Sequence, residues 1–242
     1  MKKLLIAFSA LFACLACTES PDVDQLAPNQ RNVTIIAKTD ISRASYDPNT
    51  MSTRWEATDI IGCFAEYNNN IKFKATNITA NEFSSLVTKD PSEFYFYFPY
   101  NREAKMANGV LKSELATTQL LRAGAYAPTI PLVAYTTSLD DVSFSNLCGV
   151  LSFNVRSNID RILTSFSFES NDGSPVAGEY TVDMNQKVPT LSLGSQTSSK
   201  VTLEGNVPLT AETDYRFYIF LPPTVHAKGF TITLGDAKDR TF

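Results

Sequence analysis

Histidine and tryptophan are almost absent from this chain: each occurs once in 242 residues, as His226 and Trp55. A single histidine excludes a histidine-rich metal site, and it leaves only His226 for any triad that uses an imidazole base. The sequence also lacks a phosphate-binding loop, a Gly-x-Gly-x-x-Gly turn after a strand and a Gly-x-Ser-x-Gly elbow. We therefore expect no enzyme activity and no cofactor, although a catalytic carboxylate pair among the 25 acidic residues stays open.

A large excess of charge of either sign is lacking too. The chain has 21 basic and 25 acidic residues, a formal net charge of −4, which argues against a nucleic-acid partner. With 43% hydrophobic and 19% charged residues, the composition is that of a folded globular protein. Its length allows one large domain or two modest ones.

The N-terminus has the pattern of a bacterial lipoprotein leader. Lys2 and Lys3 precede an apolar run over residues 4–13, which is too short to span a membrane as a helix. Cys14 and Cys17 follow, where a lipobox places the cysteine that is acylated. The pattern predicts lipidation of one of these cysteines without separating them, while cleavage by ordinary signal peptidase is the alternative.

A lipid on this cysteine would hold the protein on a bilayer, since each buried CH₂ contributes about 0.8 kcal/mol. We therefore assign residues 1–17 to the signal peptide and lipobox. Residues 18–31, with two prolines and several acidic side chains, are expected to form a flexible tether. The acidic residues Glu19, Asp22 and Asp24 behind the lipobox resemble the surface-export signal of some Gram-negative lipoproteins, which implies a surface-exposed protein anchored to the outer membrane.

Alternation of apolar and polar residues with period 2 dominates the rest of the chain. Val33, Ile35 and Ala37 share one face of an expected strand, and the phenylalanines of residues 94–98 share one face of another. Similar runs cover residues 147–155, 162–168, 215–221 and 230–234. Residues 107–126 are the best helical candidate, but they contain glycines and β-branched residues. The pattern predicts an all-β sandwich protein.

A turn-rich stretch near residues 138–143 suggests a domain boundary. We expect an N-terminal β-sandwich over residues 32–140 and a C-terminal one, which is incomplete, over residues 141–242. Because Cys63 and Cys148 fall in different expected domains, each inside an apolar strand, we predict that both are free thiols.

Four aromatic residues, Tyr67, Tyr95, Tyr97 and Trp55, allow two interpretations. They could form a platform for a glycan, although aromatic residues on strands are more often part of a hydrophobic core. The second interpretation is the simpler one.

Several segments, taken in order, resemble the fimbrillin family, the lipoprotein pilins and accessory proteins of type V pili. The resemblance rests on the lipobox, the strand NVTIIAKT and the sequences ISRASYD, STRWEATDIIGCFAEY, YFYFPYN and VSFSNLCGVLSFNV. It runs over most of the mature chain, and no single segment is specific. Cys63 departs from the family pattern, which has an aliphatic residue after Gly62.

The resemblance implies two tandem transthyretin-like β-sandwiches and export as a lipoprotein. It also implies that an Arg-specific protease cuts behind the first strand, which in this sequence falls between Arg43 and Ala44. Cleavage would remove residues 32–39 and leave a groove for a strand from another pilin subunit, bound by β-strand addition. Arg43 could equally be an ordinary exposed residue, and Arg31 and Arg54 are basic sites near strand ends as well.

Two functions follow from these features. The first is a structural or accessory subunit of a surface fimbria, acting in adhesion; the alternative is a surface lipoprotein that binds glycan or another ligand without polymerising. The last expected strand contains Phe230, Ile232 and Leu234, and only three residues follow its turn. We therefore expect an uncovered apolar groove beside residues 230–234, and no strand donation through residues 240–242.

Overall fold

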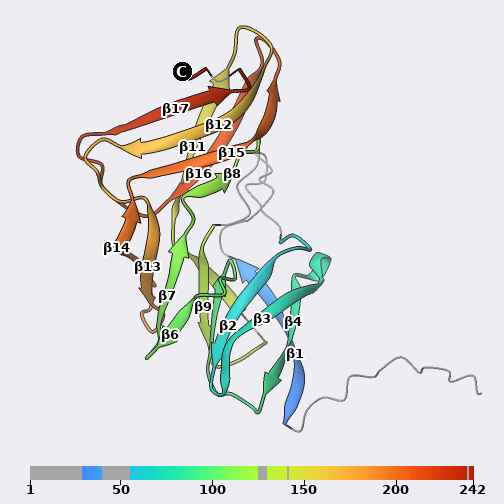
Figure 1. The fold of residues 1–242 in the computed structure, drawn as a ribbon. Helices are drawn as coiled ribbons and strands as arrows, with labels where there is room; N and C mark the ends of the chain where they lie inside the picture. Colours follow the sequence, from blue (N-terminus) through green and yellow to red (C-terminus); the bar gives the residue numbers. More distant parts are fainter. Residues whose placement is uncertain (1–28, 40–54, 125–129, 141, 239) are drawn as a thin grey trace, which may run out of the picture.

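The computed structural model describes residues 29–39, 55–124, 130–140, 142–238 and 240–242, and these are folded almost entirely into β-strands (Figure 1). The predicted all-β fold is confirmed. Within the described residues there is no α-helix, and one short 3-10 helix, η1 (Ile78–Ala80), joins two strands. The segment considered as a helical candidate, residues 107–126, contains the strands β7 (Val110–Leu115) and β8 (Thr118–Leu120) instead. Burial alternates along β7 with period 2, as is typical of a strand with one face in the core. No helix in the described part of the chain is long and apolar enough to cross a membrane.

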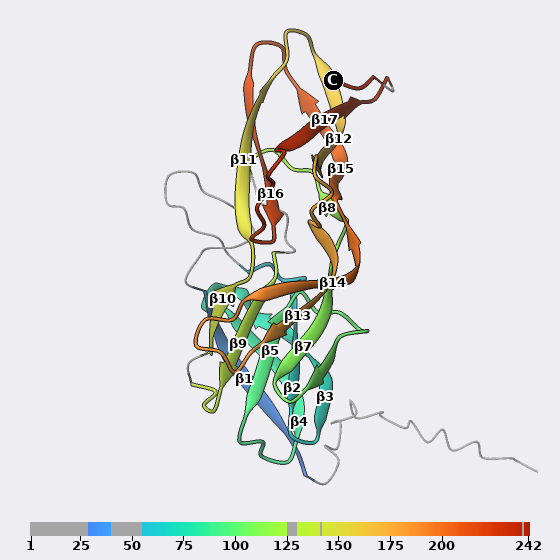
Figure 2. The same cartoon turned by 90° about the vertical axis from the view of Figure 1, so that its left-hand side faces the viewer.

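Seven strands form a sheet that closes on itself at one end of the molecule (Figures 1 and 2). Around the sheet they are β1 (Gln30–Thr39), β10 (Val142–Asn146), β9 (Leu132–Thr136), β5 (Phe94–Phe98), β2 (Ile60–Ala65), β3 (Asn68–Asn77) and β4 (Glu82–Thr88), which pairs again with β1. Large apolar side chains fill the interior; among the most deeply buried are those of Ile35, Phe73, Phe83, Phe96 and Phe144.

Two further sheets face each other at the other end of the molecule. One contains β17 (Phe230–Asp236), β12 (Arg161–Ser170), β15 (Lys200–Leu209) and β8, and the other contains β11 (Gly149–Arg156) and β16 (Asp214–Leu221). A separate hydrophobic core that includes Phe166, Phe168, Phe217 and Ile219 belongs to these two sheets.

A fourth sheet links the two ends of the molecule. It consists of β14 (Leu191–Ser198), β13 (Ala177–Asp183), β7 and β6 (Lys105–Ala107). Its buried side chains, such as Leu111 and Tyr180, belong to the same core as the closed sheet. β7 and β8 follow each other in the chain but lie in different sheets, so this segment runs from one end to the other (Figure 1).

This topology corrects the division predicted at residues 140 and 141. β10 lies beyond that boundary, yet it pairs with β1 and β9 in the closed sheet. β13 and β14 also come from the second half and pack on the first core, whereas β8 crosses in the other direction. A contiguous division fails because strand pairing joins segments far apart in sequence, and composition does not reveal such pairing.

Candidate strand-exchange surface

β1 begins at Gln30, so Gln30 and Arg31, the last two residues of the tether predicted over residues 18–31, belong to the strand instead. The strand places one apolar face in the core of the closed sheet. Val33, Ile35 and Ala37 are at most 3% exposed, whereas Ile36, between two of them, is 43% exposed. The predicted alternation of this strand is therefore confirmed. Because side chains alternate across a strand, β1 covers the core with every second residue.

The two edges of β1 are held unequally. On one side β1 pairs antiparallel with β4 over seven residue pairs, from Gln30 with Thr88 to Ile36 with Glu82. On the other side it pairs parallel with β10 over only three residue pairs, from Ala37 with Val142 onwards. Loss of β1 would open the closed sheet between β4 and β10 and leave both strands with unpaired backbone groups.

Trp55 holds the C-terminal part of β1 from inside the core. Its indole Nε1 donates a hydrogen bond of 2.9 Å to the carbonyl oxygen of Ala37. The indole ring is 5% exposed and makes edge-to-face contacts with Phe83, Phe98 and Phe144 at centroid distances of 5.0–5.6 Å. Removal of β1 would therefore break this hydrogen bond and expose the cluster of aromatic side chains around Trp55.

The residues predicted for processing and anchoring are Cys14, Cys17, Arg43 and Ala44, and all four lie outside the described residues. The competing arginine Arg31 lies inside β1, where it pairs with Val87 and its side chain contacts Asp90 at 2.6 Å. A protease needs an extended, accessible segment, so cutting at Arg31 requires β1 to leave the sheet first. Arg54 lies outside the described residues as well.

β17 forms the edge of the other main sheet, and the return segment covers only half of that edge. Leu234 and Phe242 exchange two backbone hydrogen bonds of 3.1 and 3.0 Å, and the Asp236 amide donates to the Arg240 carbonyl oxygen at 3.1 Å. Along residues 230–233 the described chain provides no strand on the outer side of β17.

The predicted groove residues line this edge to different extents. Phe230 is 43% exposed and stacks on Phe168 at a centroid distance of 4.7 Å, while Ile232 and Leu234 are half-buried against the second core. Phe153 of β11 reaches across to Phe230, with ring centroids 6.5 Å apart. The apolar surface beside β17 is therefore shallow and shared with β11.

The free edge of β16 is capped by a side chain. The Gln119 amide donates to the carbonyl oxygen of Phe220 at 3.0 Å and accepts from its backbone amide at 3.4 Å, as a neighbouring strand would. The amide of Gly124 also donates to the Arg216 carbonyl oxygen. Strand addition at this edge would have to displace both contacts.

The four aromatic residues considered as a glycan platform are not brought together. Trp55 and Tyr97 lie in the core, with at most 5% exposure. Tyr67 is exposed beneath the Lys89 ammonium, whereas Tyr95 pairs with Tyr135 on the outer face of the closed sheet. The expectation that these residues serve packing holds for Trp55 and Tyr97.

Both core cysteines are free and buried, as predicted, but the reason differs from the expected one. Cys63 and Cys148 belong to the same hydrophobic core rather than to separate domains. Burial raises the pKa of the Cys148 thiol to about 12 and raises the pKa of Cys63 as well. Both are inert thiols that pack as small apolar groups.

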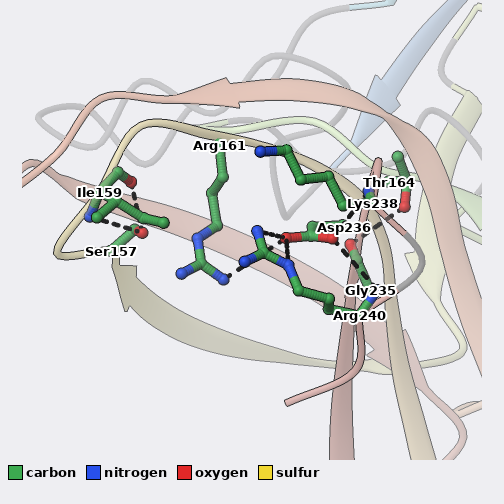
Figure 3. Close-up of polar contacts among 8 residues, drawn as sticks. All are labelled: Ser157, Ile159, Arg161, Thr164, Gly235, Asp236, Lys238 and Arg240. Atoms are coloured by element: carbon green, nitrogen blue, oxygen red, sulfur yellow. Dashed lines mark hydrogen bonds and ion pairs between the residues drawn. The ribbon is translucent and has the colours of Figure 1, made fainter.

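A charged cluster at the turn after β17 has no counterpart in the sequence-based predictions (Figure 3). Asp236, 4% exposed, accepts hydrogen bonds from the backbone amides of Lys238 and Arg240 and from the Arg240 guanidinium. The hydrogen bond from the Arg240 guanidinium, the largest contribution, lowers the pKa of Asp236 to about 2. The available signal was a turn sequence, GDAKDR, with an acid and an arginine four residues apart.

Comparison with known proteins gives one structural match. No family model matches the chain, and no curated protein is significantly similar to it in sequence. The chain is similar in structure to a crystal structure of a "putative cell adhesion protein" from Bacteroides ovatus, with a TM-score of 0.51 and 14% sequence identity. The match covers 88% of this chain and 84% of the other. At this identity the likeness shows a shared fold.

Proposed function

We propose that this protein is a structural or accessory subunit of a cell-surface fimbria, that it joins neighbouring subunits by β-strand addition and that it serves adhesion. The observation that carries the proposal is the place of β1: it is the first described strand, it covers an aromatic core, and on its β10 side it is held by only three residue pairs. The adhesion role is supported by the fold shared with the Bacteroides ovatus protein.

In this proposal, an Arg-specific protease cuts between Arg43 and Ala44, and β1 leaves together with the tether. The vacated groove lies between β4 and β10 and has the Trp55 indole and Phe83 at its floor. A strand from another subunit would regain the backbone hydrogen bonds of β4, while its alternate apolar residues would replace Val33, Ile35 and Ala37.

The anchor is part of the same proposal. Acylation of Cys14 or Cys17 would hold the unprocessed subunit on the outer membrane, and cleavage after Arg43 would release it from its lipid. Replacing both cysteines with serine is expected to move the unprocessed protein from the detergent phase to the aqueous phase. Continued partition into detergent would contradict the anchor.

The test of the function is the state of the protein on its native cell surface. Intact mass and N-terminal sequencing of material sheared from cells should give a chain that begins at Ala44, and negative-stain microscopy should show fibres. An uncut, lipid-bearing monomer that binds a glycan array without forming fibres would favour the alternative function.

A further inference from the structure

Arg161, the first residue of β12, carries a guanidinium that has no close acceptor in the described part of the chain, although its side chain is only 16% exposed. Its Nε is buried with no hydrogen-bond partner among the described residues. The nearest carboxylate oxygen, on Asp236, lies 3.8 Å from its Nη1, which is too far for a strong hydrogen bond. Phe242 offers only its ring face, 4.5 Å from the guanidinium carbon.

Asp236 does not need Arg161. Both of its carboxylate oxygens already accept hydrogen bonds within the turn, from two backbone amides and from Arg240. Arg161 is therefore a surplus cation beside a satisfied ion pair, and buried polar groups of this kind are normally paired. Figure 3 shows the three side chains together, with Lys238 extending from the turn in the direction of Arg161.

These charges line a cavity of about 470 Å³ at the end of the β12–β15–β17 sheet. Among the described residues, its charged lining is cationic by one, with Arg161, Lys238 and Arg240 against Asp160 and Asp236. The Asp160 carboxylate is already engaged, since it accepts a hydrogen bond of 2.7 Å from the Ala211 amide. The remaining wall is largely apolar and is formed by Ile162, Pro208, Leu209 and Ala237.

We propose that this cavity binds an acidic sugar, a single ring that carries a carboxylate. The carboxylate would take the free guanidinium nitrogens of Arg161 and the ammonium of Lys238, since arginine and carboxylate form the strongest polar pairs in proteins. The C–H face of the sugar would lie on the apolar wall. The volume is in the range of small-molecule sites, and the apolar wall favours a ring with a carboxylate over a small inorganic anion. This inference is independent of strand exchange.

The experiment is a titration of the folded protein with a sugar, and binding is measured by calorimetry and by ligand-observed NMR. Glucuronic acid and N-acetylneuraminic acid are the test ligands, and glucose, which has a hydroxymethyl group in place of the carboxylate of glucuronic acid, is the neutral control. We expect at least one acid to bind, and glucose to bind at least tenfold more weakly. Inorganic phosphate is the second control, and it should bind more weakly than the acid.

Arg161→Gln should weaken binding of the acid at least tenfold, and Arg161→Lys should recover part of the loss because it restores the charge but not the fork. Lys238 is exposed and its ammonium has no partner in the described part of the chain, so Lys238→Gln should fold normally and weaken binding severalfold. Lys200→Gln, an exposed lysine of β15, is the matched control and should change nothing. The proposal is overturned if glucose or phosphate binds as tightly as the acid, or if both the Arg161→Gln and the Lys238→Gln variants bind the acid normally. It is also overturned if neither acid binds at a concentration of about 10 mM.

Discussion

If β1 holds the closed sheet through one face only, truncation of two adjacent isoleucines should have very different effects. Ile35 is 1% exposed and points into the core, whereas Ile36 is 43% exposed on the opposite face. Ile35→Ala removes three carbon groups at about 0.8 kcal/mol each and leaves a cavity, so a loss of roughly 3–4 kcal/mol in unfolding free energy is expected. Ile36→Ala should cost less than about 1 kcal/mol.

Trp55 provides the assay, because it is the one tryptophan of the chain and hydrogen-bonds β1 directly. Urea unfolding followed by its fluorescence reports on the core that β1 covers, and the slope of the transition checks that both variants unfold to a similar extent. After cleavage behind β1, a loss of about 3 kcal/mol should weaken retention of the strand roughly 100-fold. Equal effects of the two substitutions would refute the view that β1 covers the core with one face.

Three further predictions concern other parts of the fold. Alkylation of the denatured, unreduced protein should label both Cys63 and Cys148, and a pair protected from alkylation would contradict the free thiols. Alkylation of the native protein should be slow, because burial raises the pKa of both thiols. Gly62→Ala should destabilise the protein by about 1–3 kcal/mol in urea unfolding, because the added methyl group would fall inside the ring of Tyr97, and an unchanged midpoint would contradict that contact. Asp236 has a pKa lowered to about 2, so its ionised form contributes stability above about pH 4, and this stability is lost as the pH falls towards 2. Asp236→Asn should abolish this part of the decrease in melting temperature at acidic pH. A variant whose melting temperature falls with pH as in the wild type would argue against the ion pair.

The alternating patterns predicted strands correctly where one face is buried and the other is exposed. β1 is the clearest case, with Val33, Ile35 and Ala37 inside. In β5 the alternation places Tyr97 on the face opposite the phenylalanines, and both faces are buried there, which alternation alone does not predict. The ring of Tyr97 stacks on Phe64 and its hydroxyl donates to Asn70, so neighbouring elements cover that face. Such cover depends on tertiary contacts that no local period reveals.

Which strands cross from one sheet to another could not be predicted from the sequence either, because it depends on tertiary contacts. β10, β8 and β13 each pair with strands distant in sequence, and nothing in their composition distinguishes a strand that crosses from one that does not. The charged cluster was missed because Arg161 and Asp236 are brought together only by the pairing of β12 with β17. Within the site, residues Cys14, Cys17, Arg43 and Ala44 stay predictions.

The central claim is that β1 can leave after cleavage and be replaced by a strand of another subunit. Sedimentation velocity of residues 18–242, a lipid-free chain without Cys14 and Cys17, before and after treatment with an Arg-specific protease tests it most directly. Arg43→Lys is the control that keeps the charge and removes the cleavage site. We predict that the cleaved protein loses the peptide that contains β1 and forms oligomers in which a strand other than residues 240–242 of the next subunit fills the groove, while the Arg43→Lys variant stays monomeric. A wild-type protein that is cut at Arg43 but stays monomeric with β1 retained, or an uncut variant that assembles equally well, would contradict the account.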